Sequence, residues 1–396
     1  MTTPLVSTVS GEGPRAGFAV GFACTIGPGI VSLIPLAPVA ALPALSAHFS
    51  AGPNRGLFAQ LVVTAPAAVL VLTAPFSGWL AERLGSRLVL ILSLLLFAVA
   101  GGSGLIAANT AQLVAGRLIL GLAGGGILSS ALALIGANFT GNKRDWVLGF
   151  ATSLSAVVAI VALIGGGLLV DAAGWQAALG LYLIGLPAAG MVALVLPPSP
   201  AQPLAERRRF ESRTFAGLLP ILALLIISAI AIFMPSLQAS MLLSERFHLN
   251  GAQTGLVLSS SALVAMIAAG LYGWLRRFLS INQVFAFNAL CFGSGMIAIA
   301  LATSPFVVAF GCALIGVGGG TTEPAGASAA LSRMPANHHG RASGIVVSSV
   351  FLGQFLNPLA IAPIRQWGGL TAAFLGFGLL MLLLAAGLAV IHRRKR

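Results

Sequence analysis

The chain has 396 residues, of which 58% are hydrophobic and 7% charged, and its mean hydropathy is +1.01. A soluble domain carries roughly 25% charged residues, because its surface must be wetted by water. The composition therefore excludes a water-soluble protein and indicates a polytopic membrane protein, most of whose surface faces lipid.

The formal net charge is +13, with 21 Lys and Arg residues against 8 Asp and Glu. Such an excess is typical of nucleic-acid binding when the basic residues cluster on one face and contact phosphates, so their positions decide its meaning. The three cysteines, Cys24, Cys291 and Cys312, lie inside apolar runs rather than in paired or metal-type spacing. We therefore expect no disulfide, no metal site and no cofactor.

In chain order, the apolar residues form twelve runs, each long enough for a helix that crosses the roughly 30 Å hydrocarbon core. They predict an all-α polytopic membrane protein with twelve transmembrane helices in two six-helix bundles. The expected divisions are an N-terminal bundle over residues 1–198, a cytoplasmic central linker over 199–214 and a C-terminal bundle over 215–396. The runs are centred near residues 30, 68, 98, 125, 158, 186, 227, 263, 292, 318, 354 and 380.

The positions of the basic residues support that topology, because cytoplasmic loops of membrane proteins accumulate Lys and Arg. With both termini on the inner side, 17 of the 21 basic residues fall in inner loops or tails, and Arg117 lies within a span. This scattering over loop ends excludes the nucleic-acid interpretation. We expect a multi-pass protein of the plasma (cytoplasmic, or cell inner) membrane with both termini in the cytoplasm.

Two segments repeat at a constant spacing of 195 residues. Gly78-Trp-Leu at the end of the second span recurs as Gly273-Trp-Leu at the end of the eighth, and a glycine-rich segment that begins at Gly121 recurs at Gly316. Two similar halves in one orientation are typical of transporters in which one half rocks against the other around a midplane site. The repeat therefore predicts two pseudo-symmetric bundles and an activity in transport.

The loop after the second span carries the sharpest local motif. It reads Gly78-Trp-Leu-Ala-Glu82-Arg83-Leu-Gly85-Ser-Arg87 and resembles the signature of the major facilitator superfamily. In that family the loop links the two halves and stabilises the outward-facing state. The resemblance implies that Gly78 permits close helix approach, that Gly85 makes a tight turn, and that the Glu82 carboxylate, where Asp is common, meets the positive end of a helix. Arg83 and Arg87 are expected to anchor the cytoplasmic side.

Two further segments bear on the proton-coupled efflux branch of that superfamily. Arg117-Leu-Ile-Leu-Gly121 in the fourth span is similar to the arginine and glycine pattern found there. In the fifth span, Gly166 and Gly167 match part of a pattern of drug–proton antiporters, but Ala162-Leu stands where Gly-Pro is expected. That departure leaves import open beside efflux.

Two ionisable residues lie clearly within spans, where a charge costs roughly 2.5 to 3.5 kcal/mol and so faces a cavity or a partner. Glu323 lies toward the inner end of the tenth span, where Thr321 or Thr322 could donate to its carboxylate. A carboxyl group in apolar surroundings can take up a proton near neutral pH, as coupling requires. The alternative for Glu323 is a structural acid paired with a basic residue or a helix end. Arg117 could bind an anionic substrate, respond to proton uptake elsewhere, or serve as an interhelical hydrogen-bond hub.

Uncharged amides within spans are further candidates. Gln238 lies in the seventh span, and Gln354 and Asn357 lie in the eleventh. Such side chains could line a cavity and orient a substrate, or could join helices by hydrogen bonds.

Together these features favour a secondary active transporter that moves a small organic, apolar or amphipathic solute by alternating access, by proton-coupled efflux. Glu323 and Arg117 are the predicted proton-coupling residues, and Arg117, Gln238, Gln354 and Asn357 are the predicted substrate-binding residues. The expected partners are the solute, protons and the lipid bilayer, and the protein is expected to be a monomer.

Two alternatives remain beside that interpretation. An importer or facilitator of a small organic anion bound by Arg117 would be consistent with the missing Gly-Pro pair. A polytopic membrane enzyme would need a catalytic constellation inside the membrane, and the spans contain one clear acid and no histidine. We therefore do not expect an enzyme.

Overall fold

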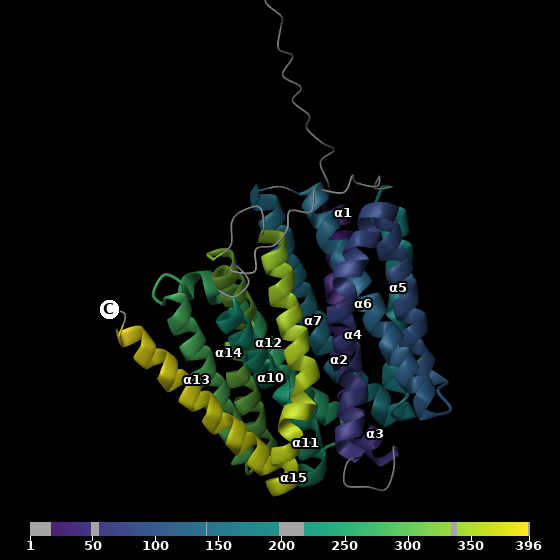
Figure 1. The fold of residues 1–396 in the computed structure, drawn as a ribbon. Helices are drawn as coiled ribbons and strands as arrows, with labels where there is room; N and C mark the ends of the chain where they lie inside the picture. Colours follow the sequence, from purple (N-terminus) through teal and green to yellow (C-terminus); the bar gives the residue numbers. More distant parts are fainter. Residues whose placement is uncertain (1–16, 49–54, 140, 198–217, 334–338, 395–396) are drawn as a thin grey trace, which may run out of the picture.

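The computed structural model describes residues 17–48, 55–139, 141–197, 218–333 and 339–394, which form helices and turns without any strand. Most of the helices lie side by side in two groups (Figure 1). The predicted linker, residues 199–214, lies outside the described residues.

The first half of the chain, up to Val195, contains eight α-helices and two short 3₁₀ helices in the described residues. These are α1 (Phe18–Val31), α2 (Leu33–Leu36), α3 (Leu42–His48), α4 (Arg55–Leu84), α5 (Ser86–Gly102), η1 (Ser103–Leu105), α6 (Thr110–Asn138), α7 (Gly141–Ala173), η2 (Ala177–Ile184) and α8 (Gly185–Val195).

The second half contains long helices and, after the first of them, a short π-helical turn. In the described residues these are α10 (Leu219–Met234), the π-helix η3 (Pro235–Ala239), α11 (Ser240–Phe247), α12 (Gly251–Leu275), α13 (Ile281–Ala300), α14 (Pro305–Leu331) and α15 (His339–Arg394).

Ten segments of the described residues are long and apolar enough to cross a membrane, and a shorter apolar segment lies in α4 at Leu57–Thr73. One of the ten, Gly344–Ile391, covers the last two predicted spans. Its two arms meet at Gly368 and Gly369, where Gly369 has a φ of 73° that glycine adopts without strain. Each of the twelve predicted span centres thus lies in a helix, and the prediction of an all-α polytopic membrane fold is confirmed.

The two ends of the bundle differ in charge. The helix ends that carry Arg83, Arg87, Lys143, Arg276 and Arg333 lie at the end that is uppermost in Figure 1, which we call the basic end. The opposite end holds α3, α11 and the break in α15.

Each half has its own apolar core, which explains why the chain forms two groups of helices. Leu90, Phe97 and Leu120 belong to a cluster that comes mainly from α1–α8. Phe292 and Phe374 belong to one that comes mainly from α10–α15. The halves meet chiefly where α7 packs against α12 and α4 packs against α15.

Candidate functional site

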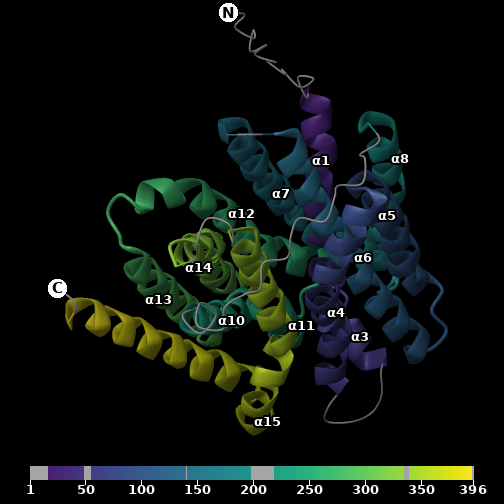
Figure 2. The same cartoon turned by 45° about the horizontal axis from the view of Figure 1, so that its top comes forward.

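A cavity of about 890 Å³ lies where the two halves meet. Its walls come from α7 of the first half, between Trp146 and Ala156, and from α12 and α14 of the second half, which lie next to one another in Figure 2. The lining is mostly apolar or glycine, and its polar side chains include those of Thr152, Ser153 and Glu323. A concave apolar site with a few polar groups is typical of small-molecule binding.

The helices α7 and α12 close against each other on the side of the cavity toward the opposite end. A Cβ atom added at Gly255 would overlap the carbonyl oxygen of Leu163, and one added at Gly167 would overlap that of Gly251. Small residues allow helix backbones to approach this closely in membranes. The two halves are therefore in backbone contact at this level.

A carboxylate also joins the halves at the closed end. Asp171, near the end of α7, accepts hydrogen bonds from the backbone N–H groups of Gly251 at 2.7 Å and Ala252 at 2.8 Å. These are the first two residues of α12, whose N–H groups have no acceptor within the helix and whose positive dipole end favours an anion. Asp171 thus caps a helix of the other half.

Toward the basic end, the same two helices separate. Gly149 of α7 and Gly270 of α12 both line the cavity there, and a Cβ atom added at either would have no atom of the described residues within 4 Å. Within the described part of the chain, the cavity is therefore closed toward the opposite end and open toward the basic end.

The Glu323 side chain is exposed and lines this cavity. No other described residue forms a hydrogen bond or ion pair with it. Thr321 instead donates to the side-chain oxygen of Asn288 at 2.6 Å, and the Asn288 amide donates to Thr322 at 3.1 Å. The expectation that a threonine donates to Glu323 is therefore wrong, because consecutive residues of a helix point about 100° apart and α14 turns its threonines toward α13.

Gln238 and Asn357 lie in a buried amide cluster between the halves, together with Gln60, which sequence reasoning did not select. Gln60 of α4 and Gln238 of η3 exchange reciprocal amide hydrogen bonds of 3.0 and 3.1 Å. Gln238 also donates to Asn357 of α15 at 3.4 Å, and Asn357 donates to the Ile230 carbonyl at 2.7 Å. The signal for Gln60 was a lone amide in the apolar segment Leu57–Thr73.

Gln354 is also fully buried, one helical turn before Asn357. Neither its amide nitrogen nor its amide oxygen has a hydrogen-bond partner in the described structure. It is not among the residues that line the cavity. The structure therefore brings together two of the three predicted amides and leaves the third unpaired.

Arg117 lies outside the cavity, in the core of the first half, and its side chain is 4% exposed. Its guanidinium donates to the Tyr182 hydroxyl at 2.7 Å, and that hydroxyl donates to the Ile34 carbonyl at 2.9 Å. These bonds connect α6 with η2 and α2. The contacts are those of an interhelical hydrogen-bond hub.

The glycines of the loop motif behave differently from each other. Gly85 has a φ of 86° at the start of α5, which forms the tight turn expected there. A Cβ added at Gly78 would have no atom of the described residues within 4 Å, so these residues do not make the close helix approach implied for Gly78 in this conformation. The Glu82 side chain lies outside the described part of the structure.

Among the described residues, the contacts of the two motif arginines are with the first half. Arg87 donates to the Ala193 carbonyl of α8 at 2.6 Å. The Arg83 guanidinium lies 4.3 Å from the ring centre of Trp79, a cation–π distance.

Cysteines and acids do not gather into a metal-binding group in the described residues. No group of three His, Cys, Asp or Glu side chains that could hold a metal ion is found there. Cys24, Cys291 and Cys312 are each buried and free.

Comparison with protein families gives a match to the model of the Major Facilitator Superfamily over residues 16–358 and again over 219–396. Among curated relatives, the multidrug efflux protein YfmO of Bacillus subtilis is 30% identical over 212 residues, 52% of this chain and 50% of the relative. The methylenomycin A resistance protein of the same bacterium is 34% identical over 119 residues, 30% of this chain and 25% of the relative. The aligned part of the chain thus spans half or less of these relatives.

Solved structures share the fold over nearly the whole chain. A peptide transporter POT in complex with sulfate has a TM-score of 0.78 at 16% identity and covers 96% of both chains. The human organic anion transporter MFSD10 (TETRAN) has a TM-score of 0.69 at 18% identity, over 95% of this chain and 100% of that one.

Proposed function

The chain belongs to the Major Facilitator Superfamily, and from that premise we propose that it exports a small organic solute by proton-coupled alternating access. The observation that carries this proposal is the cavity formed by α7 of one half and α12 and α14 of the other, closed at one end and open at the other. A site shared by both halves changes its access when one half rocks against the other.

Glu323 is the proposed proton-coupling residue. It is the acidic side chain among the residues that line the cavity, and it has no partner in the described part of the chain. A carboxylate in a membrane cavity without a fixed counter-ion is costly, so uptake of a proton or binding of a cationic group stabilises it. Efflux is the proposed direction because the relatives above carry efflux and resistance in their names.

The walls of the cavity bear on the solute. Trp146 and Phe150 stand at its side on α7, and Met266 lines it from α12. Among the described residues, few hydroxyl groups and one carboxylate accompany these apolar groups, so we propose an apolar or amphipathic solute. The amide cluster of Gln60, Gln238 and Asn357 joins the halves in the closed region in this conformation, and in this proposal its bonds break when the opposite end opens.

The proposed orientation places the basic end in the cytoplasm of the plasma membrane, with both termini inside, because basic residues remain on the inner side. The conformation described here is then inward-facing. The expected functional unit is a monomer, since one chain forms the whole cavity.

The test uses purified protein in liposomes that contain a pH-sensitive dye, with ethidium and Hoechst 33342 as amphipathic probes. Probe movement should shift the internal pH with the wild-type protein and not with Glu323→Gln. Ser153→Ala, which changes a neutral group of the same cavity, is the matched control and should behave as wild type. Equal pH shifts with wild type and Glu323→Gln would remove Glu323 from the mechanism.

A second measurement fixes the direction of transport and addresses the anion alternative. Cells that express the chain should retain less ethidium than cells that carry an empty vector. Thermal stabilisation by a panel of organic anions that is lost in Arg117→Ala would instead favour the importer.

A further inference from the structure

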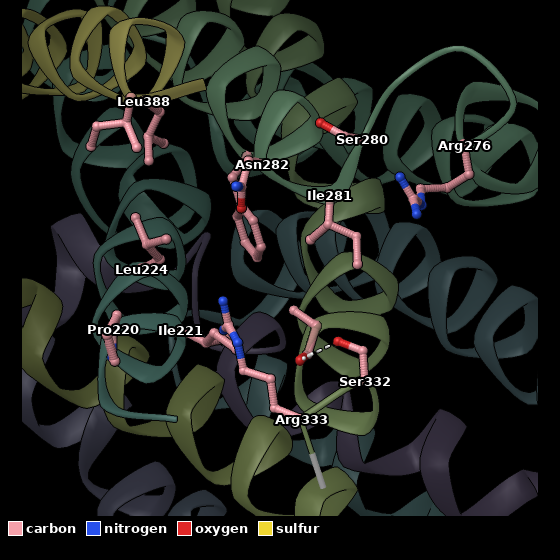
Figure 3. A pocket seen from close by; sticks show the side chains of 13 residues that line it. Pro220, Ile221, Leu224, Arg276, Ser280, Ile281, Asn282, Ser332, Arg333 and Leu388 are labelled. Carbon is pink, nitrogen blue, oxygen red and sulfur yellow. Dashed lines mark hydrogen bonds between the residues drawn. The ribbon is translucent and has the colours of Figure 1, made fainter. Parts of the chain in front are cut away.

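A second pocket, of about 390 Å³, lies at the basic end of the second half (Figure 3). Ile221 and Leu224 of α10, Phe285 of α13 and Leu388 and Ile391 of α15 form apolar walls. No residue that lines this pocket also lines the cavity of Glu323. It is therefore a separate site.

Two arginines supply positive charge to this pocket. Arg333, just beyond α14, points into the pocket in Figure 3. Its backbone N–H donates to the Ala330 carbonyl, and its guanidinium has no hydrogen-bond or ion-pair partner among the described residues. Arg276, at the end of α12, donates to the Leu279 carbonyl. None of the described residues that line the pocket is acidic. The pocket is thus electrostatically suited to an anion.

The start of α13 adds to this field. Ser280 is the N-cap of α13, and its hydroxyl accepts the N–H of Gln283. The N–H groups of Ile281 and Asn282, the first two residues of the helix, have no acceptor within it. Ser280, Ile281 and Asn282 all line the pocket. The positive end of a 20-residue helix therefore faces the same space as the two arginines.

The apolar walls decide which kind of anion fits. Leu219, which precedes the lining residue Pro220 on α10, is 52% exposed, and the lining residue Ile391 is 51% exposed. The apolar walls of the pocket therefore continue into the apolar outer surface of the protein. A small inorganic anion would gain nothing from Leu224, Phe285 or Leu388. An amphiphile with an anionic head and an apolar tail would use both parts of the pocket.

We propose that this pocket binds an anionic phospholipid. Its phosphate would lie between Arg276, Arg333 and the first N–H groups of α13, and an acyl chain would lie along Leu224 and Leu388. Basic pockets between helices at a membrane surface favour anionic headgroups for the same reason. Since α14 lines the transport cavity with Glu323 and reaches the lipid pocket two to three turns later, the two sites share one helix.

The test is a titration of dioleoyl-phosphatidylglycerol into the full-length protein in a neutral detergent, followed by native mass spectrometry. We expect the dissociation constant of the tightest bound lipid to rise about fivefold in Arg333→Gln and again in the double variant with Arg276→Gln. Arg277→Gln is the matched control, because Arg277 is exposed, lies beside Arg276 and does not line the pocket. Melting temperatures measured without lipid establish that each variant is folded.

Two further arms separate the sources of the phosphate. Dioleoyl-phosphatidylcholine, whose choline cation offsets the charge of its phosphate, should lose less affinity than phosphatidylglycerol in Arg333→Gln, and inorganic phosphate at millimolar concentration should not displace the lipid. The proposal is overturned if Arg333→Gln and Arg277→Gln weaken phosphatidylglycerol equally, if neither weakens it, or if inorganic phosphate alone occupies the site.

Discussion

Arg117 and Glu323 are both charged residues of apolar helices, yet the protein surrounds them differently. Arg117 is buried in the first half and donates a hydrogen bond to the Tyr182 hydroxyl, which donates in turn to the Ile34 carbonyl. Glu323 faces a cavity between the halves and has no partner in the described residues. The membrane penalises both charges, so the difference lies in how the cost is offset. The hydrogen bonds of Arg117 stabilise the first half, whereas the unpaired carboxylate of Glu323 remains available to a proton or a solute.

The largest effect is expected from neutralising the open carboxylate. Glu323→Gln should reduce gradient-driven transport to the level of empty liposomes while the melting temperature stays within about 2 °C of wild type, because no hydrogen bond of the described structure is lost. Transport and melting are measured on the same preparation. A large loss of stability in Glu323→Gln would show that Glu323, like Arg117, has a structural role, and would contradict the difference drawn between them.

The next effect concerns the access of water-soluble reagents to the cavity and to the core of the first half. Ser153→Cys, in the cavity, should react with a water-soluble maleimide at least about tenfold faster than Ser130→Cys, since Ser130 is fully buried in α6. The three native cysteines are buried and provide a slow background. Equal rates at the two positions would show that the cavity is not open to water.

A smaller effect is expected at the hub. Arg117→Ala should lower the melting temperature by several degrees, because it leaves the Tyr182 hydroxyl without its donor, and Tyr182→Phe should lower it at least as much, because it leaves a buried guanidinium without its acceptor. A double-mutant cycle on the pair should give a coupling free energy near the upper end of interhelical hydrogen bonds in membranes, about 1.7 kcal/mol. A coupling of zero, or selective loss of transport without loss of stability, would assign Arg117 a role in transport.

The smallest effect is expected on the other face of α14. Thr322→Val should cost about 0.6 kcal/mol, the average for an interhelical hydrogen bond in a membrane, through loss of its bond with Asn288. Proton coupling should stay at the wild-type level, which a liposome assay with the pH-sensitive dye measures. Loss of coupling in Thr322→Val would show that the two faces of α14 act together.

Hydropathy was sufficient to predict the helical membrane fold and the positions of its helices, because both follow from what lipid and water accept along the chain. The same reasoning selected Glu323, since an acid among glycines in an apolar helix is visible without a structure. It did not predict the Thr321–Asn288 bond or the pairing of Gln60 with Gln238. These contacts depend on the rotation of each helix about its axis and on which helices become neighbours, and hydropathy does not report either.

The loop motif shows a second limit. Gly85 has the expected backbone conformation, since a turn is a local property. The close approach implied for Gly78 depends on where the neighbouring helices stand, and in this conformation no atom of the described residues lies within 4 Å of a Cβ at that position. A motif that belongs to one state of a moving protein has no fixed contact in another.

The carboxylate of Asp171 recognises α12 through main-chain N–H groups, which every residue except proline carries. The side chain at position 252 is therefore free to vary over generations without weakening the closed end, provided that proline is avoided. Position 171 has less latitude, because both N–H groups donate to the side-chain carboxylate of Asp171. Among homologues that descend from this chain, we expect substitutions to accumulate at position 252 and to be selected against at position 171. An alignment would then show this contact as conservation of position 171 without conservation of its partner.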